Sequence, residues 1–213
     1  MSSEKKLSSC VVVKRNKSPS CTGRARGWVI EMTANPIVIA EYNPRWSAMY
    51  EEEKARILGA IGHIVVAIEH IGSTAVPNLG AKPIIDMMAA VRRMPDSLEC
   101  IEPLKTLGYV YYFYPQYPER CAFTYGTFGG GPCHLHMTEF MSGFWKDKIS
   151  FRDYLRAHTD VAQEYYRLKL GWAEKFGADR EKYLDYTDAK NEFISMVLEK
   201  ARDEVKQGGE KGA

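Results

Sequence analysis

The chain alternates apolar segments with segments in which apolar residues recur every three or four positions. The longest apolar segments lack polar alternation, which is typical of strands covered on both faces. A Gly-Gly-Gly-Pro run at 129–132 separates two apolar segments and predicts a hairpin there. Strands are therefore predicted at 36–40, 64–71, 83–91, 109–113, 121–128 and 133–140.

Helical periodicity occupies the segments between these strands and most of the chain after them. The order of elements predicts an α+β (or α/β) fold, in which a sheet with flanking helices is followed by a C-terminal helical layer. Helices are predicted from 43 to about 61, at 95–107, at 150–157, at 160–176, and from 179 or 186 to about 205.

One folded domain accounts for most of the chain. Its 213 residues, 45% of them hydrophobic, suffice for one sizeable core. Residues 1–31 are rich in Ser, Lys, Arg and Gly and predict a disordered or extended start. The domain is expected at 32–205, with a frayed Gly- and Lys-rich tail at 206–213.

Charge and cysteine content narrow the classes of function. The formal net charge of +2 gives no support to an electrostatically driven role on nucleic acid or at a membrane surface. No apolar run approaches the roughly 20 residues that a membrane helix needs. The five cysteines are odd in number and form no CxxC pair, which favours reduced thiols and a cytoplasmic location. The sequence does not predict an oligomeric state.

Small residues follow the apolar segment 64–71. At Gly72-Ser73 a phosphate could approach the backbone, Ser73 and Thr74 could donate to its oxygens, and Lys82 would add positive charge. The alternative is a tight turn that needs a small residue, with Lys82 as a solvated loop lysine.

Asp86 lies among Ile and Met in the strand predicted at 83–91. Burying a charge there is costly unless the carboxylate is paired or binds a metal. Asp86 is therefore a candidate metal ligand or general base. A carboxylate that caps a helix or pairs with an arginine is the alternative.

His134 and His136 stand two residues apart on a predicted strand, so their side chains share a face. With Asp86 they could ligate a transition metal, contact phosphate, or act as acid and base. Either histidine alone could instead be a hydrogen-bonded core group. Other candidates for anion contacts, each also explained by an ordinary ion pair, are Arg120, Arg152, Arg156 and Lys190.

The sequence resembles the GrpB family, also called UPF0157, which is related to a domain fused to dephospho-CoA kinase in some bacteria. The resemblance covers roughly 37–198. It is carried by YNPRW at 42–46, IEHIGSTAVPNL at 68–79, AKPIID at 81–86, HLH at 134–136, FRDYLR at 151–156, and Lys190 followed by Phe193-Ile194.

This family resembles the nucleotidyltransferase superfamily, which implies a mixed sheet flanked by helices. The superfamily pattern is an apolar residue, Gly-Ser, a spacer, then two acids two residues apart on the next strand. Gly72, Ser73 and Asp86 match it, but the second acid is replaced by Met88. Phosphoryl transfer with two metal ions needs carboxylates that hold both ions.

Three hypotheses follow from the sequence. In the first, Gly72, Ser73, Thr74 and Lys82 hold a nucleotide or another phosphorylated small molecule, helped by Arg120, Arg152 and Lys190. In this hypothesis Asp86, with His134 and His136, positions Mg²⁺ or another divalent cation or transfers a proton, in nucleotidyl or phosphoryl transfer. The second keeps the fold as a non-catalytic ligand-sensing or partner-binding domain. The third is a metalloenzyme with two histidines and one carboxylate, in which Asp86, His134 and His136 are metal ligands.

Overall fold

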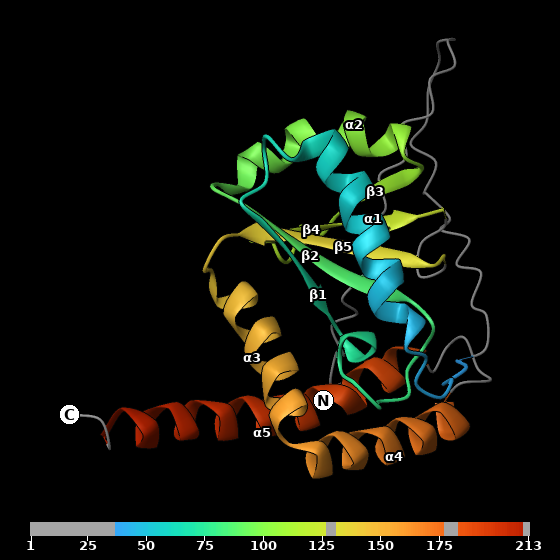
Figure 1. Ribbon diagram of the computed structural model, residues 1–213, viewed down its shortest axis with the longest axis vertical. Helices are drawn as coiled ribbons and strands as arrows, with labels where there is room; N and C mark the ends of the chain where they lie inside the picture. Colours follow the sequence, from blue (N-terminus) through green and yellow to red (C-terminus); the bar gives the residue numbers. More distant parts are fainter. Residues whose placement is uncertain (1–36, 127–130, 177–182, 211–213) are drawn as a thin grey trace, which may run out of the picture.

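The computed structural model describes residues 37–126, 131–176 and 183–210. Within these ranges a mixed five-stranded sheet has the order β1-β2-β5-β4-β3 (Figure 1). β2 and β5 pair in parallel, whereas the other neighbouring strands are antiparallel. The strands are β1 (Ala67–Ile71), β2 (Ile85–Val91), β3 (Tyr109–Phe113), β4 (Arg120–Tyr125) and β5 (Cys133–Glu139).

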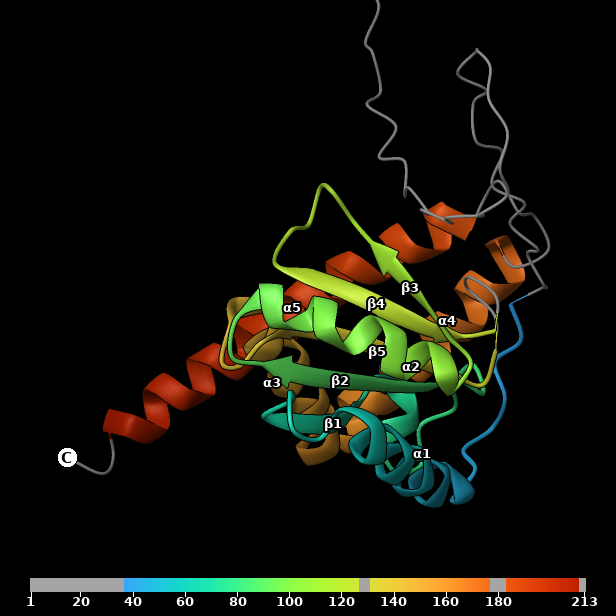
Figure 2. The ribbon, with the colours of Figure 1, turned by 90° about the horizontal axis from the view of Figure 1, so that it is seen from above.

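Helices cover both faces of the sheet. The first two lie on one face and the last three on the other, where they form a layer of their own (Figures 1 and 2). The helices are α1 (Arg45–Ile61), α2 (Ile101–Thr106), α3 (Gly143–Ala157), α4 (Thr159–Phe176) and α5 (Tyr183–Glu210), with two 3-10 segments, η1 (Ser73–Ala75) and η2 (Met94–Cys100).

The face of the sheet under α1 and α2 is a closed apolar core. Ile85 and Met87 on β2 and Leu135 on β5 point to this side and are fully buried. They pack with Ile57 and Ile61 of α1 and with Leu104 of α2. Burial of this much apolar surface is the main source of stability that the fold offers.

The face under the C-terminal helices is built differently. Met88 and Ala90 of β2 pack with Trp145 of α3 at one end of the strand. Toward its beginning, β2 carries Asp86 on the same face. A second apolar cluster, which includes Tyr165 and Val197, joins the helices to one another and to the β1–β2 connection. The polar end of this face is therefore enclosed by helices without being filled by them.

The predicted fold class is confirmed, since a mixed sheet with flanking helices is followed by a C-terminal helical layer. The strand predicted at 109–113 matches β3, and the hairpin is formed by β4 and β5, with 127–130 outside the described residues. In the described part of 36–40, only Ala40 forms a bridge, to Ala81.

The helix boundaries differ from the predicted ones in three places. The helix predicted at 95–107 divides into η2 and α2. The helix predicted to start at 150 already begins at Gly143, because the Ser142 side chain accepts a hydrogen bond from the Trp145 N–H and caps the first turn. α5 continues to Glu210, into the segment expected to fray, while 211–213 lie outside the described residues.

Candidate functional site

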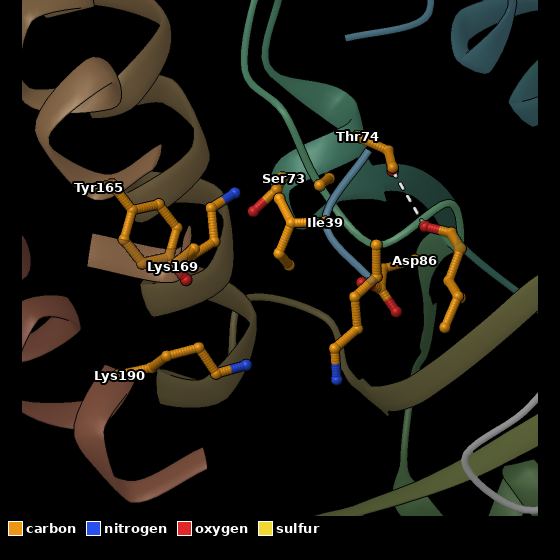
Figure 3. Close-up of a pocket in the computed structure, with 10 residues that line it drawn as sticks. Ile39, Ser73, Thr74, Asp86, Tyr165, Lys169 and Lys190 are labelled. Atoms are coloured by element: carbon orange, nitrogen blue, oxygen red, sulfur yellow. Dashed lines mark hydrogen bonds between the residues drawn. The ribbon is translucent and has the colours of Figure 1, made fainter. Parts of the chain in front are cut away.

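Two adjoining cavities lie between the polar end of the sheet and the C-terminal helices. The larger has a volume of about 320 Å³ and the smaller about 70 Å³. Their shared wall contains Ser73, Asp86, Tyr165 and Lys190. In Figure 3 the side chains of Lys169 and Lys190 extend from the helices toward Ser73 and Asp86.

Side chains from the sheet, the β1–β2 connection and α3 to α5 line these cavities. The smaller is lined by Ile39, Ser73, Thr74, Ala81, Lys82, Ile84, Asp86, Tyr165, Lys169 and Lys190. The larger is lined by Ile71, Gly72, Ser73, Asp86, Arg120, His136, Phe144, Asp147, Lys148, Phe151, Tyr165, Lys190, Ile194 and Leu198.

The Gly72 turn is in direct contact with the Asp86 carboxylate. Gly72 has a φ of 72°, a conformation that residues with a Cβ rarely adopt. A Cβ built on Gly72 would lie 2.7 Å from Asp86 Oδ2. Glycine is therefore required here both by the backbone conformation and by the close approach of the carboxylate.

Asp86 is paired with a histidine from the neighbouring strand. The parallel register places Asp86 opposite His134, and His134 Nδ1 lies 3.3 Å from Asp86 Oδ1. Burial raises the pKa of Asp86, but the hydrogen bond from His134 and the nearby charge of Lys190 outweigh it, so the pKa lies below its ordinary value. The carboxylate is ionised, and one third of the side chain is still exposed. Within the described residues, His134 Nε2 is buried without a hydrogen-bond partner.

Positive side chains converge on the larger cavity from three elements. Arg120 of β4 stacks between the rings of Tyr117, at 4.2 Å, and Phe144, at 4.5 Å. Burial lowers the pKa of Lys148 on α3, and the neighbouring Arg120 lowers it further. Burial also lowers the pKa of Lys190 on α5; Asp86 opposes this shift, while Lys148 adds to it. These groups repel one another, so the cavity favours a negatively charged occupant.

His136 lines the same cavity, on the face of β5 that it shares with His134. Burial lowers its pKa to about 4, and this outweighs the opposite effect of Asp86. His136 is therefore neutral near pH 7. It can donate or accept one hydrogen bond there but does not add to the positive charge.

The smaller cavity has two further lysines. Burial and the charge of Lys190 lower the pKa of Lys82 to about 8 and that of Lys169 to about 7. Lys169 Nζ donates to the Gly80 carbonyl and lies 4.7 Å from the centre of the Tyr165 ring. The hydrogen bond to Gly80 connects α4 to the loop that contains Lys82.

The Thr74 hydroxyl forms hydrogen bonds within the protein. It donates to the Ile84 carbonyl at 3.3 Å and lies 3.0 Å from His70 Nε2. Because the hydroxyl has one proton, the histidine nitrogen is the donor in the second contact. Thr74 lines the smaller cavity, but these bonds chiefly connect the turn to the start of β2.

Arg152 has a different place from the one predicted, because it does not line either cavity. Its guanidinium donates to Glu69 Oε2 at 2.6 Å, to the His70 carbonyl at 3.0 Å and to Asp153. One turn later on α3, Arg156 donates to the Ala75 carbonyl at 3.0 Å. The two arginines hold the backbone on either side of the Gly72 turn and so fix the position of Ser73.

Several cavity residues were not predicted from the sequence. Lys148, Lys169 and the ring of Phe144 are the main ones. Their only sequence signal is a lysine four residues from an aromatic side chain in a helix, as in Phe144–Lys148 and Tyr165–Lys169. Tyr165 of α4 lines both cavities.

The expected three-ligand metal set is not assembled in the described residues. No three His, Cys, Asp or Glu side chains in the described ranges are placed to hold one, so Asp86, His134 and His136 do not form the three-ligand set. Met88, at the position of a second acid, is fully buried. One Asp86 oxygen faces His134 and the other faces Gly72.

Comparison with known proteins identifies the family. The family model described as GrpB protein matches residues 36–200. UPF0157 protein YqkA of Bacillus subtilis is 36% identical over 78% of this chain, which spans about half (47%) of that relative's length. Glutamate-rich protein GrpB of Alkalihalophilus pseudofirmus is 32% identical over 76% of this chain and 94% of its own. The chain belongs to the GrpB family.

A solved structure and a partial match agree with this assignment. The crystal structure of conserved protein GrpB from Enterococcus faecalis superposes with a TM-score of 0.68 and 29% identity, covering 76% of this chain and 98% of that one. The expected relation to dephospho-CoA kinase is confirmed for a segment: 35% of this chain is 32% identical to 19% of that protein from Mycolicibacterium paratuberculosis. No helix in the described ranges is long and apolar enough to cross a membrane.

Proposed function

We propose that this GrpB-family protein binds a phosphorylated small molecule, such as a nucleotide, in the two adjoining cavities. The observation that carries the proposal is the excess of positive charge around Ser73. Five cationic side chains and two carboxylates line the cavities in the described residues. One of those carboxylates, Asp147, already pairs with Arg202 at 3.2 Å.

Burial makes this excess charge significant. An ammonium group removed from water is destabilised unless an opposite charge compensates it. Burial is the largest cause of the lowered pKa of both Lys148 and Lys190, and the nearby charge of Asp86 offsets it only in part. A phosphate group supplies several charged acceptor oxygens at once and would raise the pKa of both lysines.

The sizes and linings of the cavities support a ligand with two parts. A volume of about 320 Å³ is at the lower end of the usual range for small-molecule sites, roughly 300–1,000 Å³. Phe144, Phe151 and Ile194 give it apolar walls suited to a base or another apolar body. The smaller cavity, about 70 Å³ between Lys82 and Lys190, suits one phosphate group.

Binding is proposed without two-metal nucleotidyl or phosphoryl transfer. That reaction needs carboxylates that hold both ions, and Met88 stands where the second acid would be. The lowered pKa of Asp86 also makes its carboxylate a weak base. A non-catalytic ligand-sensing role is therefore favoured over transferase activity.

Isothermal titration with ATP, GTP, CTP and coenzyme A, each with and without Mg²⁺, tests the proposal. We expect at least one of them to bind, and Lys148→Met to weaken that binding by about tenfold, since one charge-assisted contact is lost. Lys146→Met is the matched control, because Lys146 lies on the same helix but is exposed and lines neither cavity. Absence of binding to all four compounds would contradict the proposal.

A further inference from the structure

We infer that the ligand is an organic phosphate bound without a divalent cation, its charge compensated by Lys148, Lys190 and Lys82. The inference rests on the proposed function and adds how the phosphate is held. In this site lysine ammonium groups compensate the negative charge of the phosphate, as metal ions do in sites with paired carboxylates.

The first support is the environment of the Asp86 carboxylate. Oδ1 lies 3.3 Å from His134 Nδ1, and Oδ2 packs against the Gly72 turn so closely that even a methyl group would lie 2.7 Å away. A cation shared between this carboxylate and a phosphate would compete with His134 at Oδ1 or would have to fit beside the Gly72 turn at Oδ2. The buried Met88 thioether, two residues along β2, offers no hard oxygen ligand in exchange.

The second support is the electrostatic field that the charged side chains produce in the cavity. Lys190 is close enough to both Asp86 and Lys148 for each to shift its pKa, in opposite directions. Lys148 is in the same position between Asp86 and Arg120. A divalent cation beside Asp86 would be repelled by these positive groups, whereas an anion would be attracted by them.

In a metal-free site, the charge of Asp86 has the opposite effect on ligand affinity from the one it has in a metal-dependent site. In a metal-dependent site the aspartate attracts the ligand through the ion, so its neutralisation weakens binding. Here the carboxylate keeps the empty lysine cluster together and repels the incoming phosphate at close range. Asp86→Asn should therefore tighten anion binding, while the Asn oxygen can still accept the hydrogen bond from His134.

The experiment measures affinity for ATP and for coenzyme A by isothermal titration, in EDTA and in excess MgCl₂. We expect binding in EDTA that added Mg²⁺ does not strengthen. For Asp86→Asn we expect about tenfold tighter binding in EDTA, from removal of one like charge. Lys190→Met should weaken binding about tenfold, and Lys146→Met should leave it unchanged. Circular dichroism and thermal unfolding of each variant confirm that it is folded.

The outcomes separate this inference from the proposed function. Binding that appears only with Mg²⁺ and disappears in Asp86→Asn would overturn the metal-free site and leave the proposed function standing. Unchanged affinity in a folded Asp86→Asn would also overturn it, because the carboxylate would then lie too far from the phosphate. Absence of binding to either compound under both conditions would overturn the metal-free site for these ligands, and the proposed function as well if GTP and CTP also fail to bind.

Discussion

The two faces of strands β2 and β5 show how one pair of strands serves two purposes. On the face under α1 and α2, Ile85, Met87 and Leu135 are fully buried in an apolar core. On the other face, the neighbouring positions hold Asp86 and His136, which line a cavity. Because side chains alternate along a strand, a shift of one residue exchanges stabilising and ligand-facing positions.

The comparison shows that the sheet separates the apolar residues that stabilise the fold from the polar residues that line the cavity, because the two sets lie on opposite faces. The apolar face makes the central strands rigid, and a rigid strand can hold a carboxylate against a turn and a histidine. Each prediction below tests whether the two faces can be perturbed separately.

Adjacent substitutions on β5 should give the largest contrast. Leu135→Ala removes a fully buried side chain from the closed core and should destabilise the fold by about 2–5 kcal/mol. His136→Gln, on the cavity side, should change the free energy of unfolding by less than about 1 kcal/mol. Urea unfolding of both variants measures this. Similar losses would contradict the division between the faces.

Acid should destabilise both faces, because each contains a histidine that is neutral near pH 7. Burial lowers the pKa of His70, which stacks on Tyr50 of α1, and the pKa of His136 to about 4 from an ordinary 6.5. The unfolded state therefore binds more protons between these values, so the stability is complete above pH 6.5 and is lost as pH falls toward 4.

For His70 alone we expect a loss of about 3 kcal/mol between pH 7 and pH 4. Urea unfolding across this range measures it, and His70→Gln should flatten the slope. The control is His63→Gln, at an exposed position. A slope that His70→Gln leaves unchanged would show that the ring is not kept neutral by the fold.

Gly72→Ala should disturb the cavity side without touching the closed core. The new methyl group would meet Asp86 Oδ2 at 2.7 Å in a backbone conformation that alanine disfavours. We expect a loss of about 1–3 kcal/mol. Gly171→Ala, inside α4 with open space around it, should instead stabilise by up to about 1 kcal/mol. Thermal unfolding compares the two, and equal effects would remove the special role of Gly72.

Arg152→Met should give the smallest of these losses, about 1–2 kcal/mol, because the His70 carbonyl loses its buried donor while Glu69 and Asp153 remain partly hydrated. Arg202→Met, which breaks an exposed pair, should change stability by less than about 0.5 kcal/mol. Hydrogen exchange of the Ser73 amide gives a second measurement. Unchanged exchange in Arg152→Met would show that the arginine does not hold the turn.

The sequence predicted what local pattern determines. Apolar runs located the central strands, and alternation put His134 and His136 on one face of their strand. Only the parallel register of β2 with β5 brings Asp86 to that same face. The position of Lys148 could not be predicted, because a lysine on an amphipathic helix faces water or a cavity according to how the helix packs. Arg152 was misplaced for the same reason: its partners Glu69 and His70 lie far away in the sequence and meet it only through the packing of α3 on β1.

The parallel pairing of β2 with β5 has a consequence for the order of folding. It joins Asp86 to His134 across a long stretch of chain, and closing such a loop is slow compared with forming a hairpin. Lys190 and Leu198 arrive from still later in the chain to complete the cavity wall. The cavity is therefore complete only when α5 has packed against the sheet layer, and a molecule that binds there would stabilise the fully folded chain.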